Sequence, residues 1–253
     1  MSIAVYALIG FSSFFLIVVP ITGGIVLNPL LALIVDPHIA VSMTVFFFML
    51  NSAIKATIFR QYILYRYFVS MLPLSIIAAI IGTYAIGLIP EIALYGLMLV
   101  LTLYFAWKKI MEFLPGYEMP EKKSSDSGNF ITSVASGFMQ GTGLGGGGSL
   151  RKTYFLAHGL SLLQMHGTTS ALSVVLGTVS TALRLQTDQV AYDDLLPIIY
   201  LIPIMILATI FGKAALIKLS KRTSDRIILI TLVTTALLLS YKFTTILLEA
   251  IVA

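Results

Sequence analysis

Residues 141–148 read Gly-Thr-Gly-Leu-Gly-Gly-Gly-Gly, and this glycine run is the part of the chain best suited to chemistry. Each glycine costs a helix interior about 1 kcal/mol relative to alanine. In a bilayer, backbone that leaves a helix survives only where it is buried in protein or lines a wet cavity. If the run lies in a membrane, we therefore expect it to mark a place where a polar molecule is handled.

A broken helix can bind an anion without any charged side chain. The first turn of a helix has N–H groups without intrahelical partners, and the helix dipole places about half a positive charge there. Gly145 to Ser149, with Gly146, Gly147 and Gly148 between them, lead into such a start, and Gly23 and Gly24 lead into a corresponding one. Two such starts that meet near the membrane midplane would form an anion site. The alternative is that the glycines only permit close helix packing, but four in succession favour the anion site.

Two basic residues, Arg151 and Lys152, directly follow the glycine run. Each would cost about 2.5–3.5 kcal/mol if it faced lipid near the midplane, so each should face a cavity, pair with another group or lie closer to the interface. Arg151 is the better substrate-binding candidate, because its planar fork holds oxyanions bidentately. Lys152 fits snorkelling to the interface equally well, and we expect Lys55 to snorkel.

Polar side chains also recur at helical spacing in two apolar segments. In the first half they are Thr44, Asn51 and Lys55. In the second half they are Thr169, Ser173 and Ser180, widened by Ser170, Gly177 and Thr181. Such stripes line a transport path or pack against another helix, and the sequence leaves both interpretations open. Thr44, Asn51, Thr169, Ser170 and Ser173 are therefore further candidates for substrate binding.

Catalysis and metal binding have little support. His38, His158 and His166 lie near the ends of apolar segments, without metal-ligand spacing or a neighbouring buried carboxylate, which favours structural or interfacial roles and predicts no cofactor. An intramembrane enzyme would need a nucleophile and a base. Ser149 with His158 or His166 offers the only pair, and nine residues do not place Ser149 and His158 on one helix face. The lack of intramembrane carboxylates also argues against a cation pump.

The composition places these residues in a bilayer. The chain has 253 residues, of which 58% are hydrophobic and 11% charged, whereas soluble domains carry about 25% charged residues. The net charge of +5 predicts no nucleic-acid partner, because the basic residues lie in short loops between apolar segments. The absence of cysteine excludes disulfides and thiolate chemistry. Residues 3–19 lack the flanks of a signal peptide, so we expect them in the mature protein.

The apolar segments predict an all-α polytopic membrane protein with about eight membrane segments. Segments 3–35 and 130–158 are broken by glycines, and a polar linker covers 113–129. The linker separates a first repeat, 1–112, from a second repeat, 130–253. Pro73, Ala78 and Gly82 recur at identical spacing as Pro203, Ala208 and Gly212, which favours a duplication. The remaining spans are expected at 39–59, 67–89, 91–110, 164–184, 194–216 and 226–248.

Charge in the loops predicts how the two repeats face. Lysine and arginine gather in the 55–66 region, around the linker and in the 213–226 loop, and basic loops stay in the cytoplasm. All three loops face the cytoplasm only if 130–158 enters and leaves on one side, as a re-entrant helical hairpin. By the repeat, 3–35 enters from the other side, with both termini outside. Two inverted-topology repeats result, as in many secondary transporters.

This pattern resembles the sulfite exporter TauE/SafE family. The resemblance is carried by Gly145–Gly148 followed by Gly167-Thr168-Thr169-Ser170, and in the first half by Gly23-Gly24 and Asn28-Pro29 followed by the 40–44 stretch. It adds Asn28 and Thr168 to the candidate substrate-binding residues. The chain departs from the family pattern at Pro20 and Thr22, at Thr153 in place of a proline, and at the Arg151-Lys152 pair.

The resemblance implies a multi-pass transporter of the prokaryotic inner membrane that moves sulfite, sulfoacetate or related sulfur-containing anions, most simply as an exporter. We accordingly expect a secondary transporter and not an enzyme, with a small anion and the lipid bilayer as partners. A coupling proton or ion and a homo-oligomer are left open. A passive anion channel, or less favoured an intramembrane enzyme, is the alternative.

Overall fold

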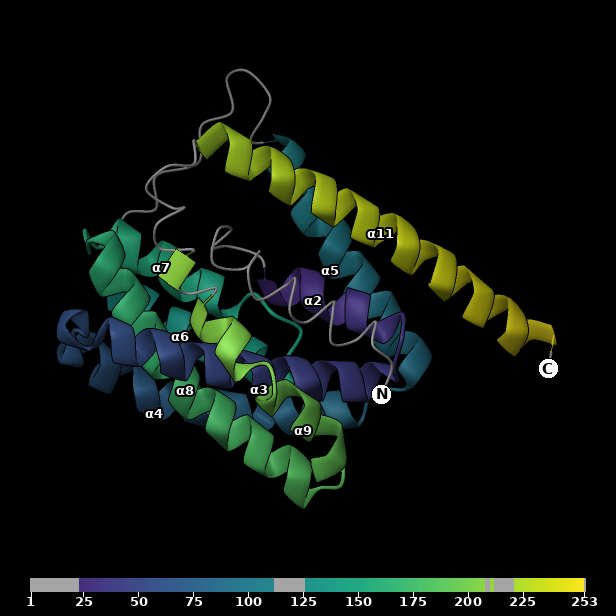
Figure 1. Ribbon diagram of the computed structural model, residues 1–253, viewed down its shortest axis with the longest axis horizontal. Coiled ribbons are helices and arrows are strands. Elements are labelled where there is room, and N and C mark those ends of the chain that lie inside the picture. Colours follow the sequence, from purple (N-terminus) through teal and green to yellow (C-terminus); the bar gives the residue numbers. More distant parts are fainter. Residues whose placement is uncertain (1–22, 112–125, 208–209, 212–220, 253) are drawn as a thin grey trace.

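The computed structural model describes residues 23–111, 126–207, 210–211 and 221–252, and all regular elements in these ranges are helical (Figure 1). The first arm of segment 3–35, nearly all of the 113–129 linker and residues 213–220 of the 213–226 loop lie outside the described residues, and the rest of that loop begins α11. The helices are α2 (Gly23–Ala32), α3 (Pro37–Ile58), the short 3-10 helix η1 (Arg60–Tyr62), α4 (Tyr65–Gly87), α5 (Glu91–Met111), α6 (Asp126–Thr142), α7 (Gly147–Ala157), α8 (Leu162–Gln186), α9 (Tyr192–Ile199) and α11 (Lys221–Val252).

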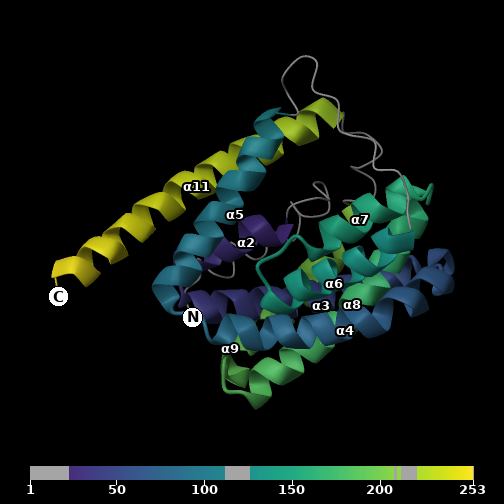
Figure 2. The same ribbon diagram turned by 180° about the vertical axis from the view of Figure 1, so that it is seen from behind.

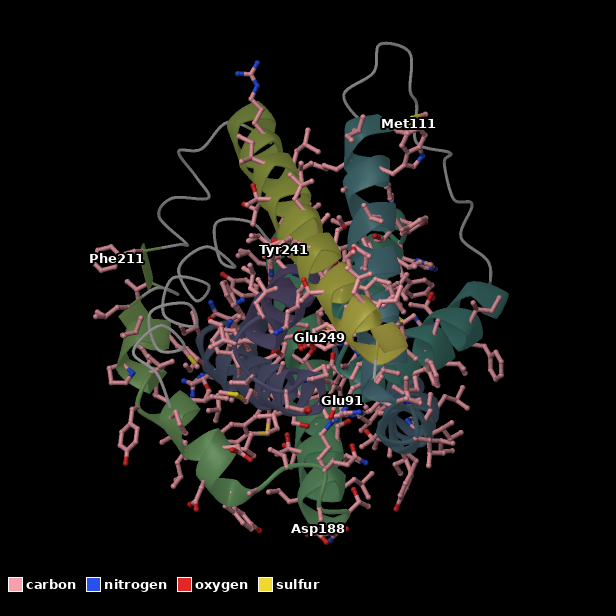
Figure 3. All side chains as sticks on the ribbon, turned by 90° about the vertical axis from the view of Figure 1, so that its right-hand side faces the viewer. Glu91, Met111, Asp188, Phe211, Tyr241 and Glu249 are labelled. Carbon is pink, nitrogen blue, oxygen red and sulfur yellow. The ribbon has the colours of Figure 1, made fainter. Side chains whose placement is uncertain are left out.

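Four of the described helices are long and apolar enough to cross a bilayer: α3, α4, α5 and the Leu229–Glu249 part of α11. Their outer surfaces carry large apolar side chains, such as Leu88, which is 84% exposed, and Tyr241, which is 77% exposed. Figure 3 shows this carbon-rich surface around the molecule. Exposed apolar surface of this extent fits lipid as the surrounding solvent. The chain is a multi-pass membrane protein.

The helices pack in antiparallel and crossing pairs around the glycine run. α4 lies along α6, α3 lies along α8, and α5 lies along α11, which extends away from the bundle in both views (Figures 1 and 2). α2 sits between α3 and α5. The ends of α3 and α8 are fixed locally: Asp36 accepts hydrogen bonds from the backbone N–H groups of His38 and Ile39, and Ser161 forms a capping box with Gln164.

The segment expected to span at 194–216 is interrupted. α9 ends at Ile199, a turn follows at residues 200–201, and helical backbone resumes at 202–207. Pro203 explains the interruption, because it has no N–H for the carbonyl of Ile199 and its ring clashes with that carbonyl. Pro73 occupies the corresponding place in the first half but lies inside the continuous helix α4. The shared spacing therefore does not produce the same local structure in the two halves.

α4 and α6 approach closely because glycines form their contact. A Cβ atom on Gly137 would overlap with the backbone of Ser75, and one on Gly82 would lie 2.5 Å from the carbonyl oxygen of Phe138. The same approach lets Ser75 Oγ donate a 3.0 Å hydrogen bond to the carbonyl of Ser133. Close backbone contact with interhelical hydrogen bonds is how helices associate in lipid.

Replacing Gly137 with alanine is expected to destabilise the protein by about 1–3 kcal/mol, because the added methyl group must push α4 away from α6. The thermal unfolding midpoint of the purified protein in detergent measures the loss. Gly96→Ala is the matched control, since its Cβ would come no nearer than 3.5 Å to any neighbouring atom, the nearest being in the ring of Phe243. Equal midpoints for the two variants would contradict this account of the α4–α6 contact.

Candidate functional site

The helix that contains the glycine run is broken within it. α6 ends at Thr142, residues 143–146 are not helical, and α7 begins at Gly147. The backbone at Gly143, Gly145 and Gly146 has φ angles of +73°, +90° and +88°. Residues with a Cβ rarely adopt such angles, so glycine is required by the local conformation as well as by space.

The two glycine clusters predicted from sequence touch each other. A Cβ on Gly24 would lie 2.8 Å from Gly145 Cα, and a Cβ on Gly145 would lie 2.7 Å from the carbonyl carbon of Gly24. A second attachment comes from Asn28 in α2, whose side-chain amide donates a hydrogen bond to the carbonyl of Gly143. The start of α2 and the break between α6 and α7 therefore form one backbone junction.

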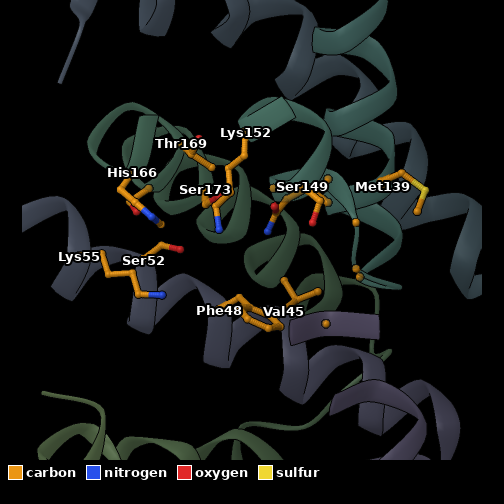
Figure 4. A pocket seen from close by; sticks show the side chains of 18 residues that line it. Val45, Phe48, Ser52, Lys55, Met139, Ser149, Lys152, His166, Thr169 and Ser173 are labelled. Carbon is orange, nitrogen blue, oxygen red and sulfur yellow. The ribbon is translucent and has the colours of Figure 1, made fainter. Parts of the chain in front are cut away.

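A cavity of about 120 Å³ opens at this junction, between α2, α3, α6, α7 and α8 (Figure 4). One water molecule needs about 10–15 Å³ of such space, so the cavity has room for a small anion with several waters. Its lining consists of Gly24, Val45, Phe48, Ser52, Lys55, Met139, Gln140, Gly143, Gly145, Gly146, Gly147, Gly148, Ser149, Lys152, His166, Thr169, Ser170 and Ser173.

The ionisable side chains of the lining are all basic. Lys152 reaches into the cavity from α7, while Lys55 of α3 and His166 of α8 approach it from the opposite side, next to Ser52 (Figure 4). Among the described residues that line the cavity there is no aspartate or glutamate. The start of α7 adds the N–H groups of its first turn, which have no acceptors within the helix. The cavity therefore offers a positive potential to a bound molecule.

Arg151 lies behind the cavity wall and is completely buried. Its Nη2 donates hydrogen bonds to Gln140 Oε1 at 3.0 Å and to Ser173 Oγ at 2.8 Å, and both acceptor residues line the cavity. Its Nε and Nη1 have no hydrogen-bond partner among the described residues. This guanidinium thus connects α6, α7 and α8 at the point where the helix is broken.

A second buried arginine, Arg184 at the end of α8, holds the other side of the break. Its Nη2 donates to the carbonyl oxygens of Gly141 and Thr142, at 2.9 and 3.1 Å. Its Nη1 donates to Ser42 Oγ and Gln189 Oε1, both at 3.2 Å. These carbonyls belong to the last turn of α6, where a cation is favoured by the helix dipole. Arg184 therefore caps α6 within the glycine run, directly before the helix break.

The structure brings most of the sequence-predicted residues to the cavity but leaves others outside its lining. Nine line it: Gly24, Gly145, Gly146, Gly147, Gly148, Ser149, Thr169, Ser170 and Ser173. Gly23 precedes the junction as the first residue of α2. Thr168 accepts a 3.0 Å hydrogen bond from the backbone N–H of Leu64. Thr44 and Asn51 are buried, and Thr44 Oγ1 and Asn51 Oδ1 have no partner among the described residues.

Nine lining residues were not among the predicted set, and five of them have polar or basic side chains: Ser52, Lys55, Gln140, Lys152 and His166. A helical stripe could have identified several of them, because residues 45, 48, 52 and 55 of α3 face the cavity, as do 166, 169, 170 and 173 of α8. His166, expected to be structural, both lines the cavity and stacks on Phe59, with ring centroids 6.1 Å apart. Within the described ranges, no three histidine, aspartate or glutamate side chains gather as a metal site requires.

Comparison with known proteins identifies the protein family of the chain. No curated protein and no solved structure matches the chain. The family model described as sulfite exporter TauE/SafE matches residues 5–239, nearly the whole sequence. That coverage includes the glycine run, the junction and every residue of the cavity lining. The chain belongs to the sulfite exporter TauE/SafE family of membrane transporters.

Proposed function

We propose that the protein is a secondary transporter that exports small sulfur-containing anions, such as sulfite or sulfoacetate, from the cytoplasm. The observation that carries this proposal is the cavity at the glycine junction, which is lined by two lysines and no carboxylate among the described residues. A family named for sulfite export is consistent with a cavity of this charge. The size of the cavity suits an anion of a few atoms.

The substrate would bind between the two glycine-rich helix starts. Backbone N–H groups of Gly23, Gly24 and the 145–149 stretch would donate to its oxygens, as helix N-termini do for phosphate and sulfate. Ser170 and Ser173 of α8 would add hydroxyl donors. The ammonium groups of Lys55 and Lys152 would balance the charge of the anion, which a low-dielectric site otherwise disfavours.

For the mechanism, we propose alternating access between two inverted repeats, residues 1–112 and 130–253, each with a broken hairpin and three spans. One repeat would rock against the other around the anion at the midplane. In this arrangement the 113–129 linker would lie in the cytoplasm and both termini outside the inner membrane, which the basic loops support. The meeting of Gly24, from the first half, with Gly145, from the second, supports this arrangement.

Purified protein in liposomes tests the proposal directly. Vesicles loaded with sulfite, thiosulfate, sulfoacetate, sulfate or chloride should release at least one of the sulfur anions at a rate that saturates with concentration, and chloride much more slowly. A conductance that does not saturate would indicate a passive channel. Release of none of these anions, in either direction, would contradict anion transport altogether.

Replacing either cavity lysine with glutamine should weaken substrate binding. Because hydrogen bonds to charged groups are worth about 1.5–3 kcal/mol each, Lys55→Gln and Lys152→Gln should each raise the KM for sulfite by about tenfold or more. Concentration series of sulfite flux in proteoliposomes give the KM. Lys108→Gln, a change of the same kind on the exposed surface of α5, serves as the control. A KM unchanged in both cavity variants would remove the lysines from the site.

A further inference from the structure

We infer that Gln140 is an anion-selecting residue of the cavity. Arg151 is the positioning residue, because its hydrogen bonds orient the amide of Gln140 and the hydroxyl of Ser173 so that their donors face the substrate. The inference rests on the proposed function, because it concerns how the same cavity distinguishes anions from other solutes. Gln140 was not among the residues predicted from sequence, and Arg151 was predicted to touch the substrate itself.

The orientation of Gln140 follows from the chemistry of its partner. A guanidinium has only donors, so the atom of Gln140 that lies 3.0 Å from Arg151 Nη2 must be the carbonyl oxygen Oε1. The amide nitrogen Nε2 occupies the other branch of the planar amide and therefore faces away from Arg151. Gln140 lines the cavity, and its Nε2 is not among the buried polar atoms that lack a partner. We therefore infer that its two N–H donors face the cavity.

Ser173 is polarised in the same way. A hydroxyl has one donor and can accept up to two hydrogen bonds, and Ser173 Oγ accepts from Arg151 Nη2 at 2.8 Å. The proton of this hydroxyl remains free to donate, and Ser173 also lines the cavity. One buried arginine thus orients a side chain on α6 and another on α8 so that both present hydrogen to the same space.

The consequence is selectivity by the type of hydrogen-bonding group. With Arg151 behind them, Gln140 and Ser173 offer donors to the cavity, and a cation would need acceptors in their place. Arg151 is completely buried, and its Nη2 contacts both partners at once, so one group sets the orientation of both. The positive charge also acts on the cavity from behind the wall, where an anion benefits from it without direct contact.

Gln140→Glu is the decisive variant. It keeps the shape and the oxygen that accepts from Arg151, but it replaces the inward-facing N–H donors with a carboxylate oxygen. We expect the KM for sulfite in proteoliposomes to rise by about tenfold or more. The maximal flux and the unfolding midpoint should stay near those of the wild type, because an arginine–carboxylate pair replaces the hydrogen bond from Arg151 to the amide oxygen. Gln164→Glu is the control, since glutamate also completes the capping box at the start of α8. An unchanged KM in Gln140→Glu would overturn the inference.

Two replacements of Arg151 separate positioning from packing. Lysine has donors only and still selects Oε1, so Arg151→Lys should keep the KM within a few-fold of the wild type. Glutamine at this position can accept as well as donate, so it lets the amide of Gln140 turn around, and Arg151→Gln should raise the KM about tenfold. Two variants with equal KM values that differ only in stability would show that Arg151 merely fills space.

Binding can be tested without transport. Sodium sulfite should raise the unfolding midpoint of purified wild-type protein above that in sodium chloride of equal ionic strength, and Gln140→Glu should lose that rise. If the wild type is stabilised but moves none of the tested anions in liposomes, the transport function fails and the role of Gln140 stands. If sulfite, thiosulfate and sulfate all leave the wild-type midpoint unchanged, the inference is overturned.

Discussion

Replacing Gly145 with alanine is expected to reduce sulfite flux to the level of empty liposomes. The alanine methyl group would lie 2.7 Å from the backbone of Gly24, closer than real Cβ contacts come, and the residue would have to hold a φ of +90°. Strained backbone of this kind costs about 1–3 kcal/mol, and relief of the overlap must separate the two helix starts that form the cavity. Flux and the amount of inserted protein should be measured together.

Gly159→Ala distinguishes the effect of backbone strain from the effect of the overlap with Gly24. Gly159 also has a positive φ, +73°, but a Cβ there would meet nothing within 4 Å. This control therefore carries the backbone strain without the overlap, and we expect nearly normal flux with a small loss of stability. Normal flux in Gly145→Ala, or equal losses in both variants, would mean that the contact between Gly24 and Gly145 is not needed for transport.

Replacing Arg184 with methionine should have the largest effect on stability. The change removes the donors to the backbone carbonyls of Gly141 and Thr142 and to the side-chain oxygens of Ser42 and Gln189. The carbonyl of Gly141 keeps its hydrogen bond from Thr83 Oγ1, but the carbonyl of Thr142 and the other acceptors lose the one from Arg184. Each buried acceptor left without a partner costs about 1–3 kcal/mol, so we expect a loss of about 3 kcal/mol. Thermal unfolding in detergent measures it. Because Gly141 and Thr142 directly precede the helix break, the flux of the remaining folded protein should fall as well.

Arg226→Met provides the comparison, since Arg226 of α11 is exposed and its loss should leave both stability and flux nearly unchanged. If Arg184→Met unfolds at the wild-type temperature, Arg184 does not hold the end of α6 in the way its hydrogen bonds indicate. Arg184→Lys tests the geometry, because an ammonium group keeps the charge but cannot reach all four acceptors at once. It should therefore restore only part of the stability.

The break in the helix was the most predictable feature of the site. Helix propensity and the demand of lipid for paired backbone are local rules, and they apply to the 141–148 run without knowledge of its neighbours. The internal repeat predicted Gly23 and Gly24 as its counterpart, and the contact between Gly24 and Gly145 brings the two together. The helical character of the described residues likewise follows from the apolar composition.

The side chains around the junction were harder to predict because their contacts are distant in sequence. Arg184 and Ser42 are 142 residues apart, and neither residue alone indicates the other. Lys55 was expected to snorkel to the interface, but α7 and α8 bring Lys152 and His166 to the same cavity. Pro203 has the spacing of Pro73, yet only Pro203 lies at a helix interruption, so spacing alone did not determine the local structure.

Binding of radiolabelled sulfite to the purified protein tests the central claim most directly, because the claim concerns where the anion is held. Wild-type protein and Gly159→Ala should bind sulfite saturably at one site per chain, and unlabelled thiosulfate should displace it far better than chloride. Gly145→Ala should show no saturable binding while it remains folded. Equal binding of sulfite by Gly145→Ala and wild type would place the anion site away from the glycine junction and contradict the account.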